Sequence, residues 1–247
     1  MDSRVAFVKG SSAILIVQES EKMRIGVLLI ISLFVYTGCA QEPPMVKTER
    51  NTFFSARSPF VQIEFPPDFI YLGSFDTTFR PRKVGSTERM NKAERTSYLY
   101  GSVADNNYMR KLIEVSVFKL SSGKHWSPET MLIVKNPIKR SIVKLGETNF
   151  QYCIKARETT NKYTAQYLLD KGHTTSSCYL WMLIGRVFED NLKMYISYYE
   201  DISNYKEFGV NNCLDWKEKE MLNPKQKRYL QEFEIRAHHS INIFKNE

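Results

Sequence analysis

Cys178–Phe188, CYLWMLIGRVF, is the stretch of sequence that decides the fold. Its residues are almost all apolar, which is typical of a strand near the centre of a sheet. Asp190-Asn191 then form a turn signal, and a second β-rich run follows over Leu192–Glu200. We therefore predict that the two runs pair as neighbouring antiparallel strands.

Further β-rich runs lie on both sides of this pair in the sequence. They are separated by turn signals such as Ala104-Asp105-Asn106-Asn107 and Gly146-Glu147-Thr148, whose residues tolerate turn conformations. The sequence predicts strands over residues 60–65, 69–75, 97–103, 108–120, 141–145, 149–157 and 162–170. In the run Asn149–Arg157 the large apolar residues alternate with polar ones, so Cys153 is expected to point away from the core.

The C-terminal stretch has the pattern of an amphipathic helix. Asn223 is a suitable N-cap, Pro224 suits the first helical position, and apolar residues then recur at spacings of three and four. This apolar stripe consists of Leu230, Phe233, Ala237, Ile241 and Phe244. The fold class predicted from these patterns is α+β, an antiparallel β-sheet meander with a C-terminal amphipathic helix packed on it, an α/β sandwich.

Three segments resemble, in their layout, the PsbP/Mog1-like fold. They are FVQIEFPPDF over 60–69, KLGETNFQYCI over 144–154 and the closing HHSINIF over 238–244. The resemblance implies the same α/β sandwich and transfers no functional residue to this chain.

Met23–Gln41, MRIGVLLIISLFVYTGCAQ, has the composition of an export signal. One basic residue, Arg24, precedes an apolar run that is too short for a permanent membrane span. The end of the segment, Thr37-Gly38-Cys39, resembles the bacterial lipobox, although Tyr36 stands where that family usually has Leu, Val or Ile. The resemblance implies that Cys39 carries a diacylglycerol and anchors the protein to a lipid bilayer. Ala40 after the cysteine implies the outer membrane, on its periplasmic side, if the host has one.

The signal divides the chain into segments. We expect translation to start at Met23, so that residues 1–22 are an upstream extension outside the true precursor; a real extension that packs as a strand pair is the alternative. Residues 23–38 are then the signal peptide and residues 39–50, which are polar and contain Pro43-Pro44, a lipidated tether. Residues 51–247 are predicted to form a single α+β domain.

Three cysteines remain once Cys39 is assigned to lipid. In an oxidising compartment, one disulfide and one remaining thiol are the expected outcome. We predict that Cys153 pairs with Cys178, with Cys213 as the rival partner.

No recognised catalytic motif occurs in the sequence, which contains neither HExxH, GxSxG nor a phosphate-binding glycine loop. The four histidines do not form a ligand cluster, and His238 and His239 are expected to be ordinary surface residues. We therefore assign no catalytic residue, metal or cofactor. The net charge of +8 favours encounters with anionic surfaces. The basic residues do not form a run typical of nucleic-acid binding.

Aromatic residues gather on the two central runs and are the candidate binding face, although cross-strand packing would produce the same pattern. The candidates are Trp181, Tyr195, Tyr198 and Tyr199. The function predicted is that of a non-enzymatic envelope lipoprotein that binds an anionic envelope component or a protein partner, or serves in structure or assembly. The alternative is a hydrolase-like envelope enzyme with an unrecognised site.

Overall fold

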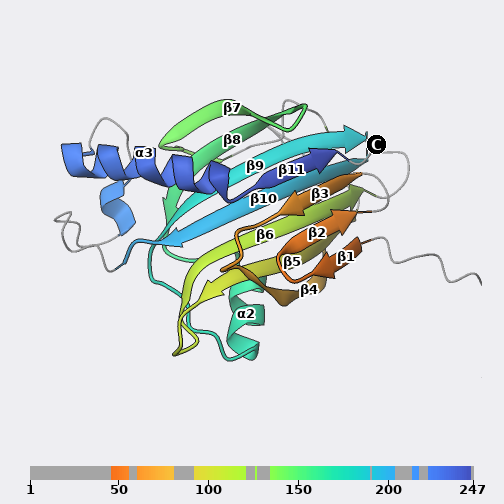
Figure 1. The fold of residues 1–247 in the computed structure, drawn as a ribbon, viewed down its shortest axis with the longest axis horizontal. Helices are drawn as coiled ribbons and strands as arrows, with labels where there is room; N and C mark the ends of the chain where they lie inside the picture. The colour runs from red at the N-terminus through yellow and green to blue at the C-terminus, as the bar shows by residue number, and fades with distance from the viewer. Residues whose placement is uncertain are drawn as a thin grey trace, which may run out of the picture. The chain divides into compact units, whose positions relative to one another are not determined.

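A seven-stranded antiparallel sheet forms the centre of the computed structural model, with the strand order β4-β5-β6-β10-β9-β8-β7 (Figure 1). The structure describes residues 46–55, 60–80, 92–120, 126, 134–189, 191–203, 213–216 and 222–245. The strands of this large sheet are β4 Ile70–Phe79, β5 Ala93–Val103, β6 Met109–Leu120, β7 Lys139–Leu145, β8 Thr148–Arg157, β9 Tyr179–Glu189 and β10 Leu192–Asp201. The predicted α+β class is confirmed.

The two runs that decide the fold are β9 and β10, and they pair as predicted. β10 is the middle strand of the seven, and its other neighbour is β6. Every residue from Tyr179 to Gly185 is buried, which explains why this stretch is almost continuously apolar. The predicted hairpins β5–β6 and β7–β8 are also confirmed.

Lys162–Asp170 form helix α2, so the prediction of a strand there is wrong. The side chain of Asn161 accepts hydrogen bonds from the backbone N–H groups of Tyr163 and Thr164, which makes it an N-cap. Only Thr164 and Leu168 are buried, and this spacing of four places them on one side of a helix. Local capping and a one-sided contact therefore outweigh the β propensity of the tyrosines and threonine.

A second, four-stranded antiparallel sheet joins the two ends of the described chain. Its order is β1-β2-β3-β11, with β1 Val46–Glu49, β2 Thr52–Ser55, β3 Val61–Glu64 and β11 Asn242–Lys245. The prediction that residues 39–50 form a tether is wrong for Val46–Glu49, because these residues pair with β2. The folded part thus begins before residue 51, and residues 44–247 form one compact unit.

Helix α3, Pro224–His239, begins where the sequence predicts. Asn223 and Gln226 form a capping box, in which each side chain accepts a hydrogen bond from the other residue's backbone N–H. The helix ends earlier than the apolar stripe predicts, because the chain leaves it at Ser240 and pairs with β3 as β11. Ile241 is consequently buried beyond the helix, whereas Phe244 on β11 is 49% exposed.

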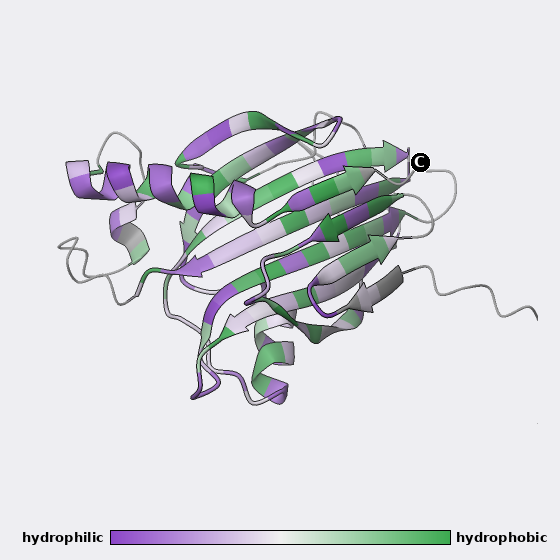
Figure 2. Cartoon of the chain, viewed as in Figure 1, coloured by the Kyte–Doolittle hydropathy of each residue, from purple (hydrophilic) through white to green (hydrophobic). Residues whose placement is uncertain are grey.

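The large sheet is covered on both faces. The small sheet and α3 lie on the front face, where Phe53, Ile63 and Phe233 share a core with the large sheet (Figure 1). Helix α2 covers part of the back face, where Leu168 belongs to a second core. Figure 2 shows hydrophobic residues along the middle strands and hydrophilic ones on the outward side of α3. Cys153 lies, as predicted, on the face opposite Phe150, Tyr152 and Ile154, but that face belongs to a second core, in which Cys153 is 0% exposed.

A buried carboxylate on β10 holds α3 against the front face. Glu200 is 5% exposed and accepts hydrogen bonds from the hydroxyls of Tyr229 at 2.5 Å and Tyr198 at 3.0 Å. The guanidinium of Arg236 donates two further hydrogen bonds, at 2.7 and 3.2 Å. Tyr229 and Arg236 both belong to α3, so the helix supplies hydrogen-bond donors to the Glu200 carboxylate that the sheet buries.

The disulfide joins Cys178 to Cys213, with a Cα–Cα distance of 5.2 Å, and the predicted Cys153–Cys178 pairing is wrong. Cys178 contributes to the front core and Cys153 to the back core, so the sheet separates the two thiols. The bond ties the short helix η4, Cys213–Trp216, to the start of β9. For residues 35 apart, the chain-entropy model gives about 4 kcal/mol of stabilisation.

Replacement of Phe233 by Ala is expected to lower the free energy of unfolding by about 3 to 5 kcal/mol, because the ring is fully buried under α3. Ile235 lies on the same helix and is 58% exposed, so Ile235→Ala is the matched control and should cost well under about 1 kcal/mol. Urea unfolding of the fragment 44–247 measures both values. Equal midpoints for the two variants would show that α3 presents a different side to the sheet.

Candidate functional site

Three of the four aromatic residues predicted as a binding face lie together on the back face. They are Trp181 on β9 and Tyr195 and Tyr199 on β10. Tyr198 lies on the front face because successive residues of a strand point to opposite sides. Its ring packs against that of Phe233, with 5.6 Å between the centroids.

The back-face aromatic residues form a packed layer. Tyr199 is 1% exposed and Trp181 is 7% exposed, and their rings stack with 6.2 Å between the centroids. Cross-strand packing thus accounts for these two rings. Arg157 lies over the Trp181 ring, 4.6 Å from its centroid, and is only half-buried. The group that faces solvent here is therefore the guanidinium of Arg157, which packs on the ring of Trp181.

Arg157 is one of four basic residues that follow the back face of the β7–β8 hairpin. The register pairs Arg140 with Cys153, so alternation places the other three on the same face as that thiol. We call this set the cationic strip: Arg140 and Lys144 on β7, and Lys155 and Arg157 on β8. The first two are exposed and the last two are half-buried.

The positive charge of the strip is largely uncompensated within the described part of the chain. Arg140 donates to the backbone carbonyl of Val134, and Lys155 donates to that of Lys135 at 2.8 Å. Neutral carbonyls fix these side chains without cancelling their charge. Lys144 lies 3.4 Å from Glu147, but both side chains are strongly exposed, so this pair contributes little.

A buried lysine lies elsewhere on the back face, within a cage of aromatic rings. The ammonium of Lys193 is 3.5 Å from the ring centroid of Trp126, 4.8 Å from that of Tyr195 and 5.1 Å from that of Phe118. Burial lowers its pKa to about 8. No carboxylate among the described residues forms an ion pair with it, so the ring faces replace part of its lost hydration.

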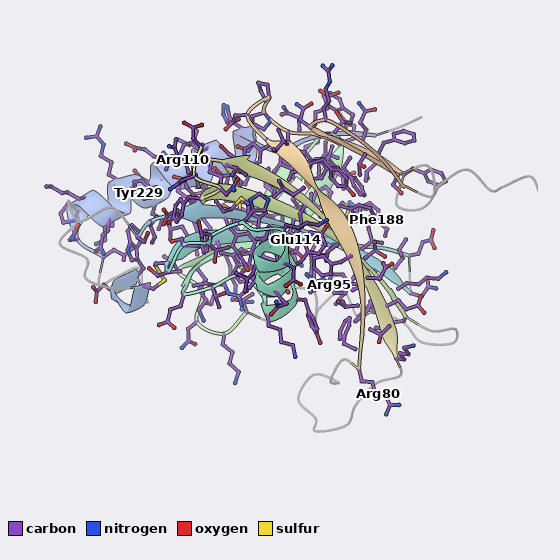
Figure 3. All side chains as sticks on the ribbon, turned by 90° about the horizontal axis from the view of Figure 1, so that it is seen from below. Arg80, Arg95, Arg110, Glu114, Phe188 and Tyr229 are labelled. Atoms are coloured by element: carbon purple, nitrogen blue, oxygen red, sulfur yellow. A yellow bond between two sulfur atoms is a disulfide. The ribbon has the colours of Figure 1, made fainter. Side chains whose placement is uncertain are left out.

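The back face also buries a carboxylate, Glu114 on β6, which is 1% exposed (Figure 3). Its two oxygens accept hydrogen bonds from β5, from β6 itself and from α2. The donors are Arg95, Ser97 and Ser116 to one oxygen and Asn161 and Thr164 to the other. Because the N-cap of α2 is among these donors, Glu114 fixes where that helix lies on the sheet.

The thiol of Cys153 is unsuited to nucleophilic chemistry. It is fully buried, and burial raises its pKa to about 11. At neutral pH the group is therefore a protonated, inaccessible thiol.

Within the described ranges, no three His, Cys, Asp or Glu side chains gather to hold a metal ion. In the same ranges no helix is both long enough and apolar enough to cross a membrane. The expectation that His238 is an ordinary surface residue is wrong, because its ring packs edge-on against Tyr152 at 5.0 Å and burial lowers its pKa. His239 is exposed as expected. Cys39 and His125 lie outside the described residues.

Sequence patterns also mark Glu114 and Lys193, although neither was predicted as a site residue. Each is a single charge in a run of mostly apolar residues, LIEVSVF for Glu114 and LKMYIS for Lys193. A charge within a strand that is buried on both faces must find donors or rings inside the protein. The cationic strip also has a signal, since residues 139–145 and 148–157 contain five basic residues and no acidic one.

Comparisons of the chain with protein-family models, with curated proteins and with solved structures find no match. The resemblances to the lipobox and to the PsbP/Mog1-like layout therefore stay predictions.

Lys193 is expected to make stability depend on pH in an unusual direction. Its folded-state pKa of about 8 lies below the ordinary value of 10.5, so between these limits the unfolded chain binds more protons and stability rises with pH. Lys193→Met should remove this rise and stabilise the protein at pH 7 by up to about 3 kcal/mol. Urea unfolding between pH 7 and 10 measures the difference, with exposed Lys162→Met as the control. A Lys193→Met protein that is less stable at pH 7 would mean that the rings stabilise the ammonium more than burial penalises it.

Proposed function

We propose that this chain is a membrane-anchored envelope lipoprotein whose domain is a non-enzymatic module that binds an anionic partner. The anchoring part rests on Met23–Cys39, with its apolar run, small residues and terminal cysteine. The Cys178–Cys213 disulfide supports export, because such bonds persist mainly in oxidising compartments.

The cationic strip is the observation that carries the binding part of the proposal. Four basic side chains share one face of a hairpin, and three of them have no carboxylate partner among the described residues. A partner with phosphate or carboxylate groups would complement this face. An acidic component of the envelope and an acidic segment of a protein both have this chemistry.

The alternative of a hydrolase-like enzyme has no specific support in the described residues. Glu114 and Glu200 are the buried carboxylates that could act as an acid or base, and both are saturated by hydrogen-bond donors. Their geometry serves to position the two helices.

Replacement of Cys39 by Ala is expected to abolish labelling by a clickable fatty acid and to move the protein from the membrane to the soluble fraction. More than one acyl chain is expected on the cysteine, and each buried methylene contributes about 0.8 kcal/mol, so the wild-type anchor should be firm. Cys153→Ala is the matched control, since its buried thiol should not be labelled. Persistent labelling of Cys39→Ala would place the anchor elsewhere.

Neutralising the cationic strip is expected to weaken binding to a polyanion. The fragment 44–247 should be retained on immobilised heparin, and the double variant Arg140→Gln/Lys144→Gln should elute at lower sodium chloride. Lys225→Gln/Lys227→Gln is the matched control, because it changes the net charge equally at exposed positions of α3. Equal elution of the two double variants would show that only total charge matters and would reject a specific anionic site.

A further inference from the structure

The cationic strip carries an exposed apolar side chain at its centre. Ile142 lies between Arg140 and Lys144 on β7, on the same face as both, and is 66% exposed. Alternation along the strand produces this order of cation, apolar residue and cation. Opposite it on β8, the register places uncharged Gln151 next to Ile142 and Asn149 next to Lys144.

The strip lies at the border of the large sheet. β7 is the last strand in the order and pairs only with β8 among the described strands. The back faces of β7 and β8 are exposed from residue 140 to residue 151, whereas Cys153 and its neighbour on β9, Leu183, are buried. Arg140, Ile142 and Lys144 therefore lie on an exposed part of the sheet face.

The combination of basic side chains with an exposed isoleucine distinguishes between possible anionic partners. A soluble polyanion offers charge but no apolar phase, so it would leave Ile142 in water. An anionic bilayer offers phosphate groups above a hydrocarbon boundary, which suits basic side chains that surround an exposed apolar one. The surface also matches the location that the proposed function implies, because a lipid on Cys39 would hold the domain close to head groups.

We propose that the cationic strip lies against anionic phospholipid head groups, with Ile142 inserted between them. This inference rests on the proposed function for the location of the protein and specifies the partner of the same site. A lipid anchor and a basic surface are the two signals that together give stable membrane attachment.

Vesicle flotation of the fragment 44–247, which contains both described cores and lacks the lipid anchor, tests the proposal. The fragment should float with vesicles of phosphatidylglycerol and phosphatidylcholine and not with phosphatidylcholine alone. Each basic residue near such a surface contributes about fivefold in affinity, so Arg140→Gln/Lys144→Gln should bind about 25-fold more weakly. The control Lys225→Gln/Lys227→Gln should bind as the wild type does.

Ile142→Ser separates a lipid surface from other anions. It should weaken flotation with the phosphatidylglycerol vesicles and leave retention on heparin unchanged, because only the bilayer accepts the apolar side chain. Circular dichroism and urea unfolding check that each variant keeps its fold.

Absence of flotation, or equal flotation of Ile142→Ser and wild type, would overturn the membrane assignment. Strip-dependent heparin retention without flotation would keep the anionic site of the proposed function and reject its lipid partner. The labelling of Cys39 is measured independently and decides the anchor in either case.

Discussion

Two buried glutamates fix the arrangement of this protein, because each one fastens a helix to a different face of the same sheet. Glu114 on β6 receives the N-cap side chain of α2, and Glu200 on β10 receives the tyrosine and arginine of α3. A buried carboxylate without donors is very costly, so each helix can dock only where its donors reach these oxygens. The two charges specify position, while apolar side chains of the helices, such as Leu168 of α2 and Phe233 of α3, supply the burial.

A sheet that is covered on both faces explains most of the remaining structure. Alternation along β9 and β10 sends neighbouring residues into two different cores, which is why Tyr198 lies under α3 and Tyr199 lies in the back core. The same separation places Cys153 apart from the other two described cysteines, since Cys178 and Cys213 meet at the front. Lys193 is enclosed on the back face by aromatic rings, and no carboxylate of the described residues forms an ion pair with it.

The β7–β8 hairpin differs from the central strands of the large sheet because part of its back face, between residues 140 and 151, is exposed. Its basic residues suit an edge of the sheet, since charged side chains discourage pairing with the edge of another molecule. The same charges, with Ile142 among them, give the domain a surface that complements an anionic bilayer. Protection of an edge and the proposed contact with a membrane thus involve the same residues, and the proposed lipid anchor at Cys39 would bring this surface to its partner.

The sequence by itself determined the class of the fold, the pairing within the hairpins β5–β6, β7–β8 and β9–β10, and the start of α3. These features depend on local patterns: the continuous apolar run of β9, the turn signals of the hairpins, and Asn223-Pro224 at the helix start. It also placed the candidate lipidation site at Cys39, which the structure does not describe.

Only the tertiary structure decided what depends on contacts between distant segments. The helical state of Lys162–Asp170 requires the sheet surface and Glu114, and the end of α3 is set by the pairing of Asn242–Lys245 with β3. The sheet face on which each thiol lies decides the disulfide, since Cys178 and Cys213 share the front core. Cys153 is buried because the back face of the sheet is also covered at that position. The sequence shows that both strands are basic, but only the register of β7 with β8 shows that Arg140, Lys144, Lys155 and Arg157 share one face.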